Sequence, residues 1–211
     1  MGWKTREFRD LFPKGHIPII LGSIIQAGET LRRKTPNEIE NRLTRCLCIK
    51  LNQLLVFRDG PLSIHPQQEI LSSDPDIDTP QGYIDILVSC GYGSEVYFAI
   101  EAKRLRVRSI EGKMKAGNDG YVNDGMMRFV TGQYAPYMKT GAMLGYVYDG
   151  DIRKARTGIA GYILKKTKEL KIVPPKRLAR SSMLPEKLVD ETRHELGKRM
   201  FTIYHVLLSV M

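Results

Sequence analysis

The chain has 211 residues, of which 42% are hydrophobic and 27% are charged, a balance typical of a folded globular chain and not of a disordered one. This length favours one domain with embellishments. Lysine and arginine number 33 against 23 aspartates and glutamates, which gives a formal net charge of +10. Such a surplus favours an anionic partner, with nucleic acid or an acidic membrane surface as the leading classes.

The cysteines and the N-terminal residues indicate the cellular compartment in which we expect the protein. The three cysteines form no CxxC pair and no even framework, which argues against a zinc knuckle and against a disulfide scaffold. The opening residues, MGWKTREFRDLF, mix acids and bases without an apolar leader segment. No apolar run approaches the roughly 20 residues that cross a bilayer. We therefore expect a soluble, unexported protein of the reducing cytoplasm, with no membrane partner.

The N-terminal arm looks irregular, but it contains an apolar run, HIPIILGSIIQAG, that fits either a short buried helix or a strand starting near Pro18. Behind it, Thr35 as N-cap and Pro36 at the first helical position predict a helix through NEIENRLTRCLCIKLNQLL. On the helical wheel Glu40 falls inside the apolar stripe, whereas Glu38 points to the far side. Glu40 would then face the core, or it lies at the edge of the stripe and complements the helix dipole.

Three strands are predicted next. PLSIHPQQEIL alternates loosely and predicts the first strand, and the turn-rich SSDPDIDTPQG follows it. Residues 84–89 and 96–103 read as two buried strands joined through CGYGS, where Gly91 and Gly93 can supply positive φ angles. These two strands therefore form an antiparallel hairpin.

The hairpin carries charged residues of the types that are rarely buried without a partner. Glu101 and Lys103 share a face because alternate strand residues do. Two registers keep Asp85 on that face: directly opposite Glu101 if Cys90 faces Val96, or one diagonal step away if the pairing slides by two residues. A slip of one residue would separate the carboxylates.

Two neighbouring carboxylates repel each other unless a cation lies between them, and hard oxygen ligands favour Mg²⁺ or Mn²⁺. A divalent ion beside an ammonium group, in a basic protein, suits phosphodiester hydrolysis, in which charge develops on phosphate and water is activated. The alternative is that Lys103 is only a salt-bridge partner of Glu101 or Asp85.

The second half adds further elements. NDGYVNDGMMRFVTGQYAPYMKTG predicts a helix capped near Asn123 or Asp124 and ending around 136–141. AMLGYVYDGD suits a strand buried on both faces, and Asp151 can cap a helix over about 152–170. After a proline-rich loop, KRMFTIYHVLLSV predicts a closing strand. The basic residues of this helix and loop that we expect to contact phosphates are Arg153, Lys154, Arg156, Lys165, Lys166, Lys168, Lys171, Lys176, Arg177 and Arg180.

The element order predicts an α/β fold with a mixed central sheet flanked by helices. We expect a single domain over 1–211, with a core at about 35–150, an N-terminal arm at 1–34, and a basic helix, loop and closing strand at 151–211.

Asp85 followed by Glu-Ala-Lys at 101–103 resembles the PD-(D/E)XK nuclease superfamily, the restriction-endonuclease-like fold. The two motifs look like its metal-binding Asp and its (D/E)xK signature, on the second and third strands. The helix–strand–strand–strand–helix–strand order of residues 35–150 is similar to its core. The proline that often precedes the Asp is absent, because Asp85 follows Ile84.

The resemblance implies roles for individual residues. Asp85 and Glu101 would bind Mg²⁺ or Mn²⁺, the backbone carbonyl of Ala102 would add a ligand, and Lys103 would act on the attacking water. Glu40 matches an acid on the first helix that reaches the metal in many members, with Glu38 as the fallback.

QYAPY resembles a Gln and Tyr pair, four residues apart, of the RecB-type members. Gln133 would help to hold the lysine or a phosphate; otherwise it is an amide on a helix face bonded to a neighbouring carbonyl. We expect Tyr134 and Tyr137 to be packing residues.

The leading hypothesis is a metal-dependent deoxyribonuclease that leaves a 5′-phosphate and a 3′-hydroxyl. The alternative is a non-cleaving nucleic-acid-binding or assembly subunit. A small-molecule or acyl-transfer enzyme lacks support, because no GxSxG and no phosphate-cradling glycine loop is present. By analogy, the small size predicts a homodimer or a subunit of a larger complex, such as a prokaryotic restriction or phage-defence system. The four histidines, His16, His65, His194 and His205, are expected to be structural, although the last two could lie by the site.

Overall fold

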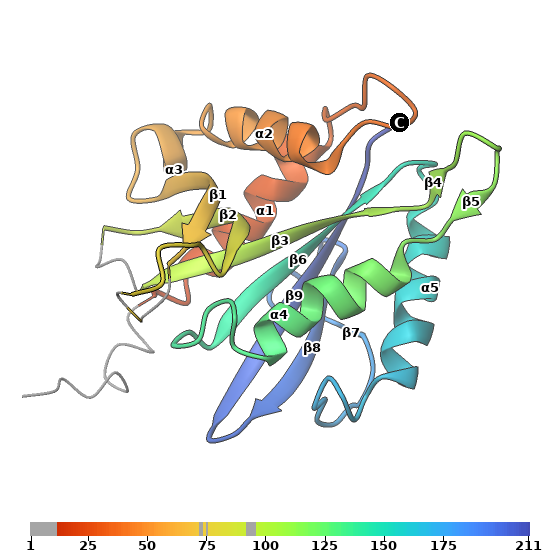
Figure 1. Cartoon of the computed structure of the whole chain (residues 1–211). Coiled ribbons are helices and arrows are strands. Elements are labelled where there is room, and N and C mark those ends of the chain that lie inside the picture. Colours follow the sequence, from red (N-terminus) through yellow and green to blue (C-terminus); the bar gives the residue numbers. More distant parts are fainter. Residues whose placement is uncertain (1–11, 72–73, 75, 92–95) are drawn as a thin grey trace, which may run out of the picture.

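The computed structural model describes residues 12–71, 74, 76–91 and 96–211. These residues form an α/β protein in which five α-helices and one π-helix flank a seven-stranded sheet of order β1-β2-β3-β6-β9-β8-β7 (Figure 1). β3, β6 and β9 are parallel, and the other neighbours are antiparallel. The predicted fold class, a mixed sheet flanked by helices, is confirmed.

The strands are β1 Ser63–Ile70, β2 Gly82–Ser89, β3 Tyr97–Leu105, β4 Val107–Arg108, β5 Met114–Lys115, β6 Thr140–Val147, β7 Ala179–Arg180, β8 Val189–Leu196 and β9 Arg199–Ser209. The helices are α1 His16–Gly28, α2 Glu40–Leu51, α3 Leu55–Arg58, the π-helix η1 Gly120–Met126, α4 Met127–Val130 and α5 Ile152–Lys165. β4 and β5 form a separate two-stranded sheet.

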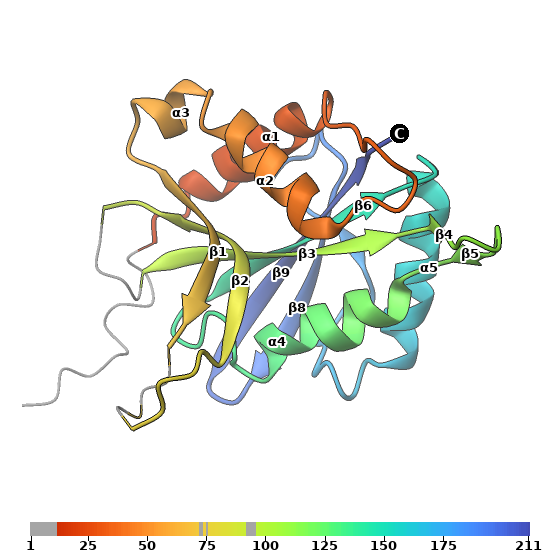
Figure 2. The ribbon, with the colours of Figure 1, turned by 45° about the horizontal axis from the view of Figure 1, so that its top comes forward.

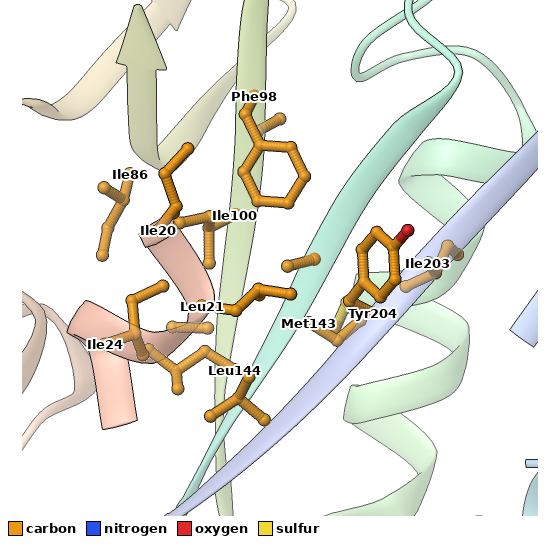
Figure 3. Packing of buried hydrophobic residues seen from close by; sticks show 14 of the residues in the cluster. Ile20, Leu21, Ile24, Ile86, Phe98, Ile100, Met143, Leu144, Ile203 and Tyr204 are labelled. Carbon is orange, nitrogen blue, oxygen red and sulfur yellow. The ribbon is translucent and has the colours of Figure 1, made fainter. Parts of the chain in front are cut away.

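Helices cover both faces of the main sheet. α1 and α2 lie over one face, and α4 and α5 lie on the other side (Figures 1 and 2). Ile20, Leu21 and Ile24 of α1 point at the sheet beside Ile100 of β3 and Leu144 of β6 (Figure 3). Glu101 and Lys103 alternate with Ile100 along β3 and therefore face the opposite layer of helices.

The apolar run of the N-terminal arm is a helix, α1, which begins two residues before Pro18. Proline is tolerated in the first turn, because its missing N–H would have no partner within the helix there. The run is hydrophobic on most sides because it is covered by α2 and by the sheet.

The predicted start of the next helix is wrong. α2 begins at Glu40, and Thr35 and Pro36 lie in the turn before it. The main-chain carbonyl of Glu38 accepts hydrogen bonds from Tyr148 Oη at 2.5 Å and from Arg104 Nη1 at 3.3 Å. These long-range bonds hold the segment against β3 and β6 and keep it out of the helix.

The predicted bounds of the helix that precedes β6 are also wrong. It is already helical at Gly120, ahead of the predicted caps, and α4 ends at Val130, so Gln133 does not lie on a helix. Gly132 adopts φ +81°, a left-handed conformation that ends helices and favours glycine. The prediction that this helix extends to 136–141 is therefore wrong.

Towards the C-terminus the strand predicted in AMLGYVYDGD and the closing strand predicted in KRMFTIYHVLLSV are confirmed as β6 and β9. Asp151 caps α5 as predicted, accepting a bond from the Lys154 amide at 2.9 Å, but α5 ends at Lys165 and not near 170. The segment taken as a loop contains β7 and β8, which the sequence analysis missed. Within the described part of the chain, no helix has the length and apolar character needed to cross a membrane.

Candidate active site

The strands β2 and β3 separate at the charged residues. Their ladder runs from Ser89–Tyr97 to Ile86–Ile100 and stops there, while β3 continues along β6 to Leu105. Continued by one residue, this register places Asp85 opposite Glu101, the direct arrangement of the two that the sequence left open. We call this opening between β2 and β3 the fork; Figure 2 shows the two strands diverging between α2 and α4.

Asp85 takes the place of the missing ladder bond. Its Oδ2 accepts the backbone N–H of Ala102 at 2.7 Å, and only 8% of the residue is exposed. The carboxylate is therefore held against the middle of the Glu-Ala-Lys segment. A charge-assisted bond to a main-chain donor fixes its orientation more firmly than a solvated carboxylate would be fixed.

Glu101 is fully buried and only half satisfied. Its Oε1 accepts Lys103 Nζ at 2.5 Å and lies 3.1 Å from Arg128 Nη1. Its Oε2 is buried and has no hydrogen-bond partner within the described residues. Such an oxygen is rare in folded proteins, and a bound ion is one of its ordinary explanations.

Lys103 and Glu40 meet at the fork. Glu40 Oε1 lies 3.8 Å from Lys103 Nζ, and the two side chains are 20% and 17% exposed. Glu38 does not join them, because its carboxylate accepts the Lys34 amide at 2.7 Å and Arg42 Nη1 at 2.5 Å. Of the two acids considered for this place, Glu40 is therefore the one that faces the site.

Gln67 of β1 is a neighbour of the site that the sequence analysis missed. It lies opposite Asp85 in the β1–β2 register, adopts φ 54°, and donates from Nε2 to Asp85 Oδ1 at 3.3 Å. Its Oε1 accepts Asn41 Nδ2 of α2 at 3.2 Å. A non-glycine residue with this φ is uncommon, and such conformations cluster at functional sites. One of two adjacent glutamines in a polar strand gives no signal of this in the sequence.

Burial dominates the electrostatics of the acids. It raises the pKa of Glu101 to about 8, the nearby charge of Asp85 adds to the effect, and Lys103 and Arg128 oppose it. Burial also raises the pKa of Glu40. Burial disfavours the charge of Lys103, but Glu101 and Glu40 outweigh it, and the pKa of this lysine is raised. The lysine is therefore a stable cation, and burial beside Asp85 disfavours the ionised form of Glu101 unless further positive charge is supplied.

A groove of about 550 Å³ opens beside Lys103 and is otherwise lined by residues of η1, α4 and the turn after α4. Gln133 lines it, but its Nε2 donates to the Gln81 carbonyl at 2.8 Å. The bond to a carbonyl matches the second interpretation of Gln133, although the residue lies in a turn and not on a helix. Tyr134 and Tyr137 pack in or against the hydrophobic core, as expected.

Arg128 is a second residue that the sequence analysis missed. It lines the same groove, contacts Glu101, and lies over the ring of Tyr134 with its guanidinium carbon 5.2 Å from the ring centroid. It also donates to the hydroxyl of Tyr134. A lone arginine on an amphipathic helix gave no reason to single it out, because its partners come from β3 and from the following turn.

Some of the basic residues expected to contact phosphate are engaged within the protein. Arg156 binds Asp190 through two bonds of 2.7 and 2.8 Å, and Arg180 lies 3.5 Å from the same aspartate. Lys154 and Lys166 pair with Asp151 and Glu169. Arg156 is therefore a structural residue, and a phosphate-binding role for the others stays a prediction.

The histidines of β8 and β9 form a separate buried cluster, the histidine network, made of Tyr121, Thr192, His194 and His205. His205 bonds the Tyr121 hydroxyl through Nδ1 and the Thr192 hydroxyl through Nε2, both at 3.0 Å. His194 bonds the same Thr192 at 2.8 Å and the Leu170 carbonyl at 2.7 Å. Burial lowers the pKa of His205 to about 3 and that of His194 to about 4. Both are neutral structural residues, as expected.

One feature of the fork fits a divalent cation. Among the described residues Glu101 Oε2 is buried without a partner next to the charge of Asp85, and a cation would pair with both carboxylates. Asp85, Glu101 and the Ala102 carbonyl are the groups that would hold it, and Glu40 lies nearby. Among residues 12–71, 74, 76–91 and 96–211, no three histidine, cysteine, aspartate or glutamate side chains are arranged to hold a metal ion together. A cation here would therefore depend on two carboxylates, the main chain and water.

Comparison of the chain with protein-family models, with curated proteins and with solved structures found no match.

Proposed function

We propose that this chain is a metal-dependent nuclease that hydrolyses phosphodiester bonds in DNA at the fork. The observation that carries the proposal is the buried Glu101 Oε2, which has no partner among the described residues although Asp85 and Lys103 lie beside it. The element order and the placement of these residues on β2 and β3 agree with the resemblance to the PD-(D/E)XK nucleases.

When bound, Mg²⁺ or Mn²⁺ supplies positive charge that polarises the phosphate and makes water more acidic. Asp85 and Glu101 would hold the ion, and the Ala102 amide keeps Asp85 in place at 2.7 Å. Because Lys103 is a stable cation that lines the groove, its Nζ can hydrogen-bond the attacking water and stabilise negative charge on the phosphate. Glu40, 3.8 Å away, orients that ammonium group.

The experiment incubates the protein with plasmid DNA, linear DNA and RNA in Mg²⁺, Mn²⁺ or chelator, beside Lys103→Ala. We expect DNA cleavage that stops in chelator and that falls by about 10²–10³-fold in the variant, the usual effect of removing one group that stabilises the transition state. Lys187→Ala, at an exposed position in the loop before β8, is the matched control and should cut like the wild type.

The second candidate is a non-cleaving DNA-binding or assembly subunit with the same fold. It is favoured by the lack of a group of three metal-binding side chains within the described residues. DNA binding with no cleavage in any metal would support it and would rule out the nuclease.

A further inference from the structure

A small basic hairpin leaves the body of the protein at the end of the strand that carries the site. β3 ends at Leu105, and β4 and β5 form their own two-stranded sheet immediately after it, which projects beyond α5 in Figures 1 and 2. Ile110 at its tip is 95% exposed, and Met114 of β5 is 38% exposed. Ile110 is therefore an apolar side chain that is available for contact at the tip of the hairpin.

The base of the hairpin is fixed. Arg106 donates to both oxygens of Asp149 at 2.8 and 2.9 Å, and its amide donates to the Ala116 carbonyl at 3.0 Å. Gly117 closes the hairpin with φ +77°, and a Cβ there would lie 2.4 Å from the Arg104 carbonyl oxygen. The base of the hairpin is therefore fixed against Asp149 and against the end of β3, the strand that carries Lys103.

The main-chain hydrogen bonds of the tip lie within the hairpin. The Ser109 amide donates to the Lys113 carbonyl at 2.8 Å, and the Gly112 amide donates to the Ser109 carbonyl at 2.9 Å. All residues from 110 to 116 are exposed. The hairpin is a short two-stranded ribbon whose tip is open to solvent.

The positive charge of the β4–β5 hairpin favours an anionic partner. Between 103 and 115 the sequence KRLRVRSIEGKMK holds six basic residues and one acid, Glu111. Arg108, Lys113 and Lys115 are exposed on the ribbon, and Lys113 lies 3.7 Å from the equally exposed Glu111, a distance at which an ion pair contributes little. Lys103 pairs with Glu101 and Glu40, Arg106 binds Asp149, and Arg104 donates to the Glu38 carbonyl, so the exposed basic residues of the ribbon are the other three.

We propose that the β4–β5 hairpin is an arm that enters a groove of double-stranded DNA, with its basic side chains on the phosphates and Ile110 against the bases. The inference rests on the proposed function in taking DNA as the ligand of the fork. A two-stranded ribbon has the width that the major groove admits. Single-strand binding relies on aromatic platforms, and the sequence from 103 to 117 contains no aromatic residue.

The geometry also limits where the arm contacts DNA. Seven residues separate Lys103 from Ile110, and a strand rises about 3.3 Å per residue, so the tip lies within about 23 Å of the lysine. At 3.4 Å per base pair this is at most about seven base pairs from the bond that is cut.

The test measures binding of a 30-base-pair duplex and of the same strand alone as a function of salt, in the Lys103→Ala background with Mg²⁺. We expect Arg108→Ala/Lys115→Ala to weaken duplex binding about tenfold or more and to reduce the slope of log affinity against log salt by about 2. We expect Ile110→Ser to weaken it about fivefold with no change in slope, because base contacts displace no counterions.

Two matched controls lie elsewhere. Arg58→Ala/Lys187→Ala removes the same charge, and Leu55→Ser removes an apolar side chain that is 68% exposed on α3. Both should bind duplex like the parent. The inference is overturned if the hairpin variants keep the parent affinity and slope, if they weaken single-strand binding equally, or if they change only binding to anionic lipid vesicles.

Failure of the arm and failure of the nuclease are distinguishable. Cleavage of DNA by the wild type, with duplex binding that is unaffected by the hairpin variants, overturns the arm and leaves the nuclease. Hairpin-dependent duplex binding without cleavage in any metal supports the arm and rejects the nuclease.

Discussion

The fork and the histidine network are both polar clusters buried in an apolar core, but they differ in how completely their groups are paired. In the histidine network both ring nitrogens of His205 and of His194 have partners at 2.7–3.0 Å. At the fork Glu101 Oε2 has none within the described residues, while its Oε1 is shared by Lys103 and Arg128. One cluster is complete as folded and the other is not.

The difference separates a structural role from a functional one. A satisfied network stabilises one packing of the core, because each group would be costly to leave unpaired. A buried carboxyl oxygen without a partner weakens the fold, and it persists in a protein when a ligand or a reaction uses it. Three measurements of the free energy of unfolding test this difference between the two clusters.

The largest effect is expected from His205→Phe. This change leaves the Tyr121 hydroxyl without its histidine partner in the core and removes one of the two histidine bonds of Thr192, and an unpaired buried group costs about 1–3 kcal/mol. We expect urea denaturation to show a loss of about 3 kcal/mol, while His65→Phe at an exposed position should change the stability by less than about 0.5 kcal/mol. A small effect of His205→Phe would mean that the network does not hold the core.

An intermediate effect is expected from pH. The folded pKa values of about 3 for His205 and about 4 for His194 lie below the ordinary 6.5, so the unfolded chain binds more protons in acid. Their contribution to stability is complete above pH 6.5 and is lost as the pH falls from 6.5 toward those values. In Glu101→Gln we expect a loss of about 2 kcal/mol between pH 6.5 and 5.5, from urea denaturation at each pH.

The wild type should lose less over the same range. The folded pKa of Glu101, about 8, lies above its ordinary 4.5, so its stability contribution is present below pH 4.5 and is lost as the pH rises toward 8. Lowering the pH therefore stabilises the wild type at Glu101 while it destabilises the histidine network. Equal pH profiles of wild type and Glu101→Gln would contradict this difference.

The smallest effect is expected from Glu101→Gln itself at pH 7.5. The amide removes an ionisable group that burial penalises, and we expect the free energy of unfolding to rise by about 1 kcal/mol. Mg²⁺ should raise the melting temperature of the wild type and not that of the variant, because a ligand that binds only the folded state stabilises it. A variant that is less stable than the wild type, or whose melting temperature rises in Mg²⁺ as that of the wild type does, would mean that Glu101 has a structural role.

The sequence predicted the central part of the site well because local pattern determines it. Alternation along β3 put Glu101 and Lys103 on one face, and the short hairpin limited Asp85 to two registers, of which the direct one is found. The helical stripe left two placements open for Glu40, and the structure brings it to Lys103, although the helix begins later than predicted.

What the sequence could not show depends on distant partners. Glu38 is withdrawn from α2 because its carbonyl bonds Tyr148 and Arg104, far along the chain. β8 looks polar, VDETRHEL, yet it buries Thr192 and His194 because β9 and η1 supply their neighbours. Arg128 likewise becomes part of the site only when β3 and α4 come together.

The bond from the Ala102 amide to Asp85 makes the strand itself a spectroscopic reporter. In an ordinary ladder this N–H would point at a carbonyl, whose charge never changes, but here it points at a carboxylate at 2.7 Å. The proton resonance of this main-chain amide therefore responds to a ligand that binds the Asp85 carboxylate. Isotope labelling of alanine alone would let that one signal be followed in the intact protein, without a substrate.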